Sequence, residues 1–381
     1  MEVYLDNSAT TRPYDEVAQA VYDTMLNTYG NASSLHRMGK SAEDLLTECR
    51  ETISSTVYGT PEELYFTSGG TESDNMAIIG YAMANRRRGT RVITQVTEHK
   101  AVLESFAYLE KQGFDVQYIG VDSSGIVDLD AMRDAIDDNT ILVSLMAVNN
   151  ETGAIQPIDA VSAMIDHNRC AFHVDAVQAY GKLPINVKKS NIDMLTLSAH
   201  KIHGPNGVGA LYLRRGIRIN PIITGGQQEK ALRSGTENLP GIVGFAKAAE
   251  IRFANMEVTC QRIAALKEKL AQGLAAIPGA EINSPEGSLY SILNVSFKGL
   301  RSEVLLHILE SRGIYVSSGS ACNSKKGSAS YVLSAMNLGR ERVDGAIRFS
   351  LSEFNTEEEI DYVCQVAAKE VPLLVQIMNR R

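Results

Sequence analysis

The sequence AFHVDAVQAYGKLPINVKKSNIDMLTLSAHKIHGPNGVGALYL occupies residues 171–213. It contains three short apolar runs, which are Ala171–Asp175, Met194–Ser198 and Val208–Leu213. Short runs rich in apolar and β-branched residues between turn signals are typical of buried strands. This stretch therefore predicts three strands, and two of them end directly at polar residues.

The same alternation extends outward on the N-terminal side. Between about Asp15 and Arg214, helical patterns alternate with four further strand candidates: Glu63–Phe66, Arg91–Val96, Val116–Val121 and Ile141–Val148. Such an alternation predicts an α/β fold with a mostly parallel sheet that helices cover. Open sheets of this class bind ligands in the loops that follow their strands, so a site is expected there.

Beyond residue 214 the pattern changes. A turn-rich stretch, 225–241, precedes a long helical pattern from Ile242 to Leu274. Strands and helices then alternate again, at Ser291–Phe297, Ser302–Arg312, Ile314–Val316, Ala346–Leu351 and Glu357–Ile377. We expect a large domain of residues 15–250 and a smaller α+β domain formed by residues 1–14 together with 251–381.

The charge and the apolar runs of the sequence argue against nucleic acid and membranes as partners. The 381 residues include 37 Lys and Arg against 45 Asp and Glu, a net charge of −8, so no overall positive field attracts nucleic acid or an anionic membrane. The longest apolar stretch, Ile141–Val148, is far shorter than the ~20 residues of a membrane helix. The N-terminus resembles no leader peptide, which favours a cytoplasmic protein.

Cysteine usage agrees with a reducing compartment. The five cysteines form no CxxC pair and lack the spacing of metal ligands: Cys49, Cys170, Cys260, Cys322 and Cys364. We therefore expect unpaired thiols and no structural metal site.

The segment Thr67–Asn75 reads TSGGTESDN and lies between a strand and a helix. Its two glycines allow an anion to approach the backbone, the helix start offers unpaired N–H groups, and Thr71 adds a hydroxyl. The segment is therefore a candidate phosphate cup. A plain turn with Thr71 as helix cap explains it equally well when it is taken alone, and no Walker or dinucleotide fingerprint is present.

Lys201 follows a buried strand within SAHKIHGP, residues 198–205. Partial burial lowers the pKa of an amine and makes it a better nucleophile for Schiff-base formation. An exposed loop lysine is the commoner alternative. Metal binding by His200 and His203 is a weaker one, because no carboxylate accompanies that spacing.

Asp175 also ends a buried strand, in HVDAVQ. A buried carboxylate requires a cationic or hydrogen-bonding partner. A pyridinium nitrogen is one such partner, and an ordinary helix cap is the alternative. A lysine, a phosphate cup and an isolated strand-end aspartate together favour pyridoxal phosphate as the cofactor.

The same residues carry a family resemblance. Residues 193–201 with the glycines after them resemble the lysine signature of the class V, fold-type I pyridoxal phosphate enzymes. Within that class, five further segments resemble the cysteine desulfurases, in the family's order: LDNSATT (5–11), TEHKAV (97–102), NNETG (149–153), RSGTEN (233–238) and SGSAC (318–322).

The resemblance implies roles for single residues. Lys201 would bond to the cofactor and act as a catalytic base, Asp175 would pair with the pyridine nitrogen, and His99 would stack on the ring and shuttle a proton. The remaining cofactor contacts would come from Asn150, Gln178, Gly70, Thr71, Ser198 and His200, with Thr236 supplied by the other subunit of a homodimer. Arg348, assisted by Asn31, would hold the substrate carboxylate, although a strand-end cation is the simpler interpretation of Arg348 alone.

Cys322 is the candidate nucleophile among the five cysteines. Three of the others fall within helical patterns and Cys170 leads into a buried strand, which is typical of inert core thiols. Cys322 instead lies in a small, polar segment, and the nearby Lys325 and Lys326 favour a thiolate.

The activity that the resemblance implies is removal of sulfur from L-cysteine, giving L-alanine and a persulfide on Cys322. A sulfur-acceptor protein of iron–sulfur cluster assembly or tRNA thiolation would then receive the sulfur. A selenocysteine lyase and another class V aminotransferase are the alternatives. The chain departs from the family at Ala32, where the family usually has proline, and at Ala329, where a Pro-Ser pair is common.

Overall fold

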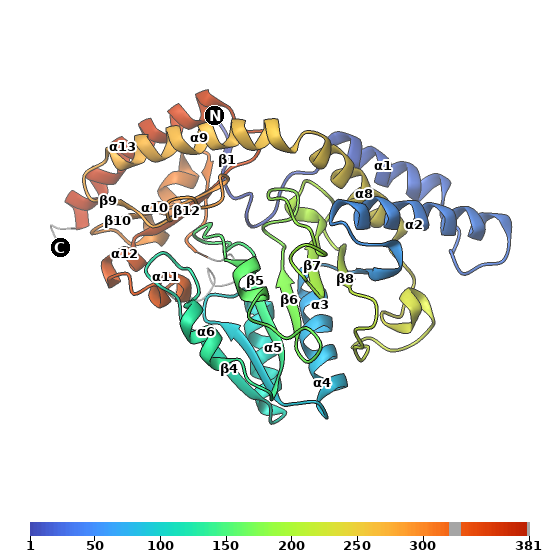
Figure 1. The fold of residues 1–381 in the computed structure, drawn as a ribbon. Helices are drawn as coiled ribbons and strands as arrows, with labels where there is room; N and C mark the ends of the chain where they lie inside the picture. Colours follow the sequence, from blue (N-terminus) through green and yellow to red (C-terminus); the bar gives the residue numbers. More distant parts are fainter. Residues whose placement is uncertain (320–328, 379–381) are drawn as a thin grey trace.

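A computed structural model describes residues 1–319 and 329–378 of the chain. Its central element is a seven-stranded sheet (Figure 1). The strand order is β2 (Leu64–Thr67), β8 (Gly209–Leu213), β7 (Met194–Ser198), β6 (Ala171–Asp175), β5 (Thr140–Met146), β3 (Arg91–Gln95) and β4 (Asp115–Ile119). Only β8 runs antiparallel to its neighbours, so the prediction of a mostly parallel sheet is confirmed.

Helices cover both faces of this sheet, because successive strand side chains point to opposite faces. On β8, Leu211 packs into one apolar cluster, while Ala210 and Tyr212 pack into another. The cluster around Leu211 is covered by η2 (Met76–Gly80), α4 (Tyr81–Asn85) and α5 (Lys100–Lys111). The opposite face is covered by α1 (Asp15–Asn27), α2 (Arg37–Thr56), α6 (Leu129–Ala135), α7 (Ile158–Ser162) and α8 (Leu239–Ala254).

A second group of elements gathers around a separate apolar cluster, which joins the N-terminal Val3 and Leu5 to residues between 263 and 374. Its strands form an antiparallel sheet in the order β12 (Ala346–Ser350), β10 (Ile292–Phe297) and β9 (Ala280–Ile282), and a parallel pair of β1 (Val3–Tyr4) and β11 (Ile314–Tyr315). Its helices are α9 (Met256–Ala275), α10 (Ser302–Ser311) and α13 (Glu357–Met378). The short helices α11 (Tyr331–Ala335) and α12 (Arg340–Asp344) pack in a small apolar cluster of their own, next to the start of β12. We propose that the cluster around Val3 and Leu5 is the core of the small domain, made of residues 1–14 and 251–381.

The structure divides one predicted helix. The pattern from Ile242 to Leu274 is interrupted at Asn255, whose φ of −118° and ψ of 12° are not helical. The Asn255 amide donates to the carbonyl of Ile251 at 3.2 Å, so the side chain competes with the backbone for this acceptor. The chain therefore turns from α8, which packs on the large sheet, into α9, which packs on the small one.

None of the helices in the described part of the chain combines the length and the apolar character that crossing a membrane requires.

Candidate active site

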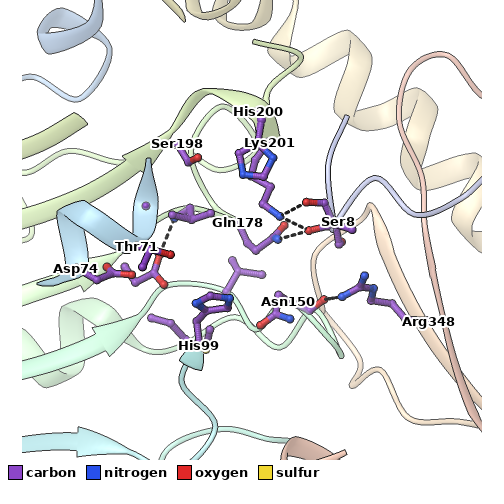
Figure 2. Close-up of a pocket in the computed structure, with 16 residues that line it drawn as sticks. Ser8, Thr71, Asp74, His99, Asn150, Gln178, Ser198, His200, Lys201 and Arg348 are labelled. Atoms are coloured by element: carbon purple, nitrogen blue, oxygen red, sulfur yellow. Dashed lines mark hydrogen bonds between the residues drawn. The ribbon is translucent and has the colours of Figure 1, made fainter. Parts of the chain in front are cut away.

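A cavity of about 210 Å³ lies at the carboxyl ends of strands β5, β6 and β7 (Figure 2). The short N-terminal segment after β1 and the start of α3 (Gly70–Asn75) complete its wall. Ten of the residues predicted from the sequence line it: Gly70, Thr71, His99, Asn150, Asp175, Gln178, Ser198, His200, Lys201 and Arg348. The fold thus gathers residues that are up to 278 positions apart, from Gly70 to Arg348.

Lys201 ends the short helix η3 (Ala199–Lys201), directly after β7. Its amine donates hydrogen bonds to the carbonyl oxygens of Ser8 and Ala9, with 2.7 Å to Ala9. Figure 2 shows the side chain pointing toward Ser8. The N-terminal segment therefore holds the nucleophilic amine at the edge of the cavity.

Asp175 is a buried carboxylate that lines the same cavity as this amine. Burial raises the pKa of Asp175 to about 6, while a hydrogen bond from the Val177 amide and the charge of Lys201 act in the other direction. A carboxylate with so little solvation is stabilised strongly by a cation placed next to it. The pyridinium nitrogen of a cofactor satisfies this requirement.

His99 caps the N-terminus of α5, and its Nδ1 accepts a hydrogen bond from the Ala101 amide at 3.2 Å. Burial, followed by the charges of Lys201 and Lys100, lowers the pKa of His99 to about 4. The ring is therefore neutral at pH 7. Because Nδ1 accepts, the single proton lies on Nε2, which leaves a donor for the cavity.

The candidate phosphate cup, Thr67–Asn75, lies next to the Ser198 hydroxyl, and its Gly70 packs closely against Val177. The Ser198 Oγ is buried and has no hydrogen-bond partner within the described residues. A Cβ built on Gly70 would lie 2.7 Å from Val177 Cγ2, so the cup leaves no room for a side chain there. His200, with a pKa lowered to about 4 by burial and by the nearby Lys201 and Lys182, pairs through Nδ1 with the Thr10 hydroxyl at 3.2 Å.

Two amides lie along the wall of the cavity. Gln178 donates from Nε2 to the Ser8 carbonyl at 3.0 Å, whereas the buried Asn150 Oδ1 has no partner within the part of the chain that the structure describes. Orphaned buried polar atoms are costly, which indicates that a ligand satisfies them. The amine, the buried carboxylate, the neutral histidine and these orphaned atoms fit pyridoxal 5'-phosphate.

Arg348 lies on β12 and is fully buried. Its two terminal nitrogens donate to the Asp6 carboxylate at 2.7 Å and to the Asn150 carbonyl at 3.0 Å. The guanidinium therefore lies at the side of the cavity that the small sheet provides, with its plane fixed. A fixed guanidinium beside the cofactor site is suited to bidentate binding of a carboxylate.

Two predicted residues, Thr236 and Asn31, do not line the cavity. Both are exposed, and Cys322 lies outside the described residues. Conversely, Ser8, Ala9 and Asp74 line the cavity without having been assigned to the site. They lie within residues 5–11 and 67–75, two segments whose motifs are described above. The motifs therefore indicate these parts of the site, although they do not identify the single residues.

Comparison with known proteins gives a consistent result. Residues 3–363 match the family described as Aminotransferase class-V. A cysteine desulfurase IscS of Methanosarcina thermophila is 46% identical over 375 residues, covering 98% of this chain and 92% of that protein. A cysteine desulfurase of a Nostoc species is 43% identical over 374 residues, covering 98% and 93%.

The solved structures agree with the sequences. A NifS-like protein has a TM-score of 0.93 with this fold at 41% identity, over 98% of this chain and 100% of that one. A second NifS-like protein, from Rickettsia africae, has a TM-score of 0.88 at 31% identity, over 98% of this chain and 99% of that one. The chain belongs to the class-V aminotransferase family and, within it, to the pyridoxal-phosphate-dependent cysteine desulfurases.

Proposed function

We propose that this protein removes sulfur from free L-cysteine, releases L-alanine and passes the sulfur through a persulfide on Cys322 to an acceptor protein. One observation carries the proposal: the Lys201 amine, the buried Asp175 carboxylate and the fixed Arg348 guanidinium share a single cavity. An amine and a carboxylate suit the cofactor, and a guanidinium suits the α-carboxylate of an amino acid.

Each group has a distinct task in this scheme. Pyridoxal phosphate, when bound, supplies an electron sink for bonds at the substrate Cα. Asp175 keeps the ring nitrogen protonated, Arg348 orients the substrate carboxylate, and the Lys201 amine takes the Cα proton and returns it. The proton on His99 Nε2 is positioned to be donated within the cavity.

The sulfur-transfer step balances without any outside oxidant. The Cys322 thiolate attacks the sulfur of the substrate, an S–S bond forms, and the Cβ–S bond breaks with its electron pair retained on the carbon side. That carbon is then protonated to give alanine. The sum is L-cysteine and a thiol giving L-alanine and a persulfide, and a reductant or an acceptor thiol later removes the sulfur.

We propose a homodimer as the working form. An apolar group on α1 and in the segment leading to α2 is exposed in the single chain: Tyr22, Met25, Leu26, Tyr29 and Leu35. Exposed patches of this kind mark interfaces. Association through this face would place Asn31, which lies in the same segment, at the interface, and Thr236 would reach the phosphate cup of the other subunit.

The acceptor and the compartment complete the proposal. We place the protein in the cytoplasm, since the described cysteines, Cys49, Cys170, Cys260 and Cys364, are free thiols. The relatives named IscS and NifS-like support an acceptor in iron–sulfur cluster assembly, with a tRNA-thiolating enzyme as a second acceptor class.

The test is product release from L-cysteine in the presence of dithiothreitol. We expect equal amounts of alanine and sulfide from the native protein and neither product from Lys201→Ala or Cys322→Ala. Alanine formation that survives Cys322→Ala would contradict the persulfide route and would favour a lyase. No turnover of cysteine by the cofactor-loaded protein would mean that another amino acid is the substrate.

A further inference from the structure

A second lysine lies directly behind the cavity. Lys182 follows Gln178 by one helical turn in the loop after β6, and it borders a small internal space of about 20 Å³ that Lys201 and Arg252 also line. Neither the cofactor assignment nor the proposed reaction uses Lys182. Its amine nevertheless contacts Gln178, a residue that lines the cavity.

The contact between these two side chains is specific. The Lys182 amine donates a hydrogen bond to Gln178 Oε1 at 3.1 Å. An ammonium group has donors and no acceptor, so it selects the oxygen of the amide and not its nitrogen. Burial, together with the charges of Lys201 and Arg252, lowers the pKa of Lys182 to about 7. The neutral amine keeps its N–H donors but also has a lone pair, so in that form the Ser8 carbonyl on the other side of the amide decides which atom faces Lys182.

The Ser8 carbonyl, on the other side of the Gln178 amide, requires the same orientation of that amide. Gln178 Nε2 donates to the Ser8 carbonyl at 3.0 Å, and a backbone carbonyl can only accept (Figure 2). Flipping the amide would place two oxygens against each other at Ser8 and an N–H group against the Lys182 amine. Lys182 and Ser8 therefore fix one orientation between them.

This orientation determines which atom of the Gln178 amide is available to a ligand in the cavity. One Nε2 proton is taken by Ser8, and the second remains for an acceptor in the cavity that Gln178 lines. Ser8 also accepts from the Lys201 amine, so Lys182, Gln178, Ser8 and Lys201 form one continuous hydrogen-bonded chain. A displacement at Lys182 is thus transmitted to both Gln178 and the carbonyl that holds Lys201.

We propose that Lys182 is a positioning residue: by holding the oxygen of Gln178 it directs the Gln178 amide N–H toward an acceptor on the bound cofactor. The inference rests on cofactor binding at this site and not on cysteine as the substrate. Its test therefore measures binding of pyridoxal phosphate, and a failure of the proposed reaction would leave the result interpretable.

The experiment is a double-mutant cycle on the full-length protein. The dissociation constant of pyridoxal phosphate is measured for the native chain, Lys182→Met, Gln178→Ala and the double variant. Loss of one oriented hydrogen bond corresponds to about a tenfold weaker binding in Lys182→Met. Because Lys182 acts through Gln178, we expect the same change to weaken binding less than about twofold when Gln178 is already alanine.

Two comparisons separate positioning from general loss of structure. Lys267 in α9 is a matched control, since its amine is also partly buried and donates to Ser288 Oγ at 2.8 Å and to the Leu289 carbonyl at 2.9 Å, outside the cavity. We expect Lys267→Met to leave the dissociation constant unchanged. The visible absorption of the bound cofactor, titrated with pH, should shift its midpoint in Lys182→Met and not in Lys267→Met.

Three outcomes would overturn the inference. They are an unchanged dissociation constant in Lys182→Met, an equal loss in both Gln178 backgrounds, and an equal loss in Lys267→Met. If Lys182→Met does not fold, Lys182→Gln replaces it and its cycle with Gln178→Ala is judged by the same criteria.

Discussion

The protonation state of His99 follows from one backbone hydrogen bond. The Ala101 amide donates to Nδ1, and burial lowers the pKa of the ring to about 4. A histidine with a lowered pKa is neutral throughout the physiological range and becomes charged only in acid. His99 is therefore a fixed donor at Nε2 and not a group that titrates during the working pH range.

This assignment predicts the pH dependence of turnover. We expect kcat/KM between about pH 5.5 and 7.5 to show no acid limb that belongs to His99, because the ring gains its proton only below this window. The profiles of the native protein and His99→Gln, measured side by side, should differ in height and not in shape. A limb near the ordinary histidine pKa that disappears in His99→Gln would refute the neutral assignment.

Arg348 offers a second test at the same scale. The Arg348→Lys change keeps the charge but loses the planar fork that binds Asp6, the Asn150 carbonyl and, in our proposal, the substrate carboxylate. We expect KM for L-cysteine to rise at least about tenfold, with a smaller change in kcat. Arg342→Lys, on α12 away from the cavity, is the control; an equal rise in KM there would remove Arg348 from substrate binding.

Among the elements, the junction between β2 and α3 determines the phosphate cup. Gly70 begins α3, and a Cβ at this position would meet Val177 Cγ2 at 2.7 Å. Gly209 on β8 is equally constrained, since its Cβ would lie 2.6 Å from the Leu197 carbonyl oxygen. The close approach of loop, strand and helix thus depends on missing side chains.

A pair of substitutions tests this packing. Gly70→Ala should weaken cofactor binding about tenfold or more, because Val177 or the start of α3 must move. Removing the obstructing methyl groups with Val177→Ala should restore much of the lost affinity in the double variant. The dissociation constant of pyridoxal phosphate is the measurement. If the double variant binds the cofactor no better than Gly70→Ala does, the clash with Val177 is not the reason for the lost affinity.

The elements also show where prediction from the sequence succeeds. All seven strands of the large sheet were found because each is a short apolar run bounded by turn residues, and the site followed because parallel strands align their ends. The break at Asn255 was missed, since a single asparagine within an apolar periodicity is a weak signal. The short strands β1 and β9 were not predicted, whereas the equally short β11 was, within the predicted strand Ile314–Val316.

Some residues of the site can be predicted from the sequence and others cannot, for a physical reason. Residues that end strands, such as Asp175 and Lys201, could be placed because the fold brings strand ends together. Ser8 contacts Gln178 and Lys201 through its backbone carbonyl, which no side-chain pattern reveals. Thr236 and Asn31 are exposed in the single chain, so the roles implied for them stay predictions that depend on a second subunit.

At the scale of the whole molecule, an ion pair between the buried Arg252 and the partly buried Glu353 links α8 of the large domain to the end of the small sheet. Arg252 on α8 donates to Glu353, which follows β12, at 3.1 Å, and Glu353 also pairs with His203 at 3.1 Å. Burial alone would raise the pKa of Glu353, but hydrogen bonding and charge from His203 and Arg252 lower it far below its usual range. His203 is only two residues from Lys201 in the sequence. These ion pairs therefore join the end of the small sheet to the loop that carries Lys201.

The lowered pKa predicts how stability depends on this carboxylate. Its contribution is complete above the ordinary glutamate pKa of about 4.3 and is lost as the pH falls below it. At pH 7, Glu353→Gln should reduce the free energy of unfolding by roughly 2–4 kcal/mol, because Arg252 stays buried without its anion. Asp361→Asn, which breaks the exposed pair with Lys269, should have a much smaller effect, because water and salt screen that pair. Urea unfolding measures both, and equal effects would contradict a special role for the pair of Arg252 and Glu353.

The central claim is that the reaction leaves the sulfur of L-cysteine on Cys322. Intact-mass analysis of the cofactor-loaded protein after one addition of L-cysteine, with peptide mapping to locate the modification, tests it most directly. The account predicts a gain of one sulfur atom on the peptide that contains Cys322, and no gain in Cys322→Ser or in Lys201→Ala. Alanine produced while the native chain gains no sulfur, or gains it on another cysteine, would contradict the account.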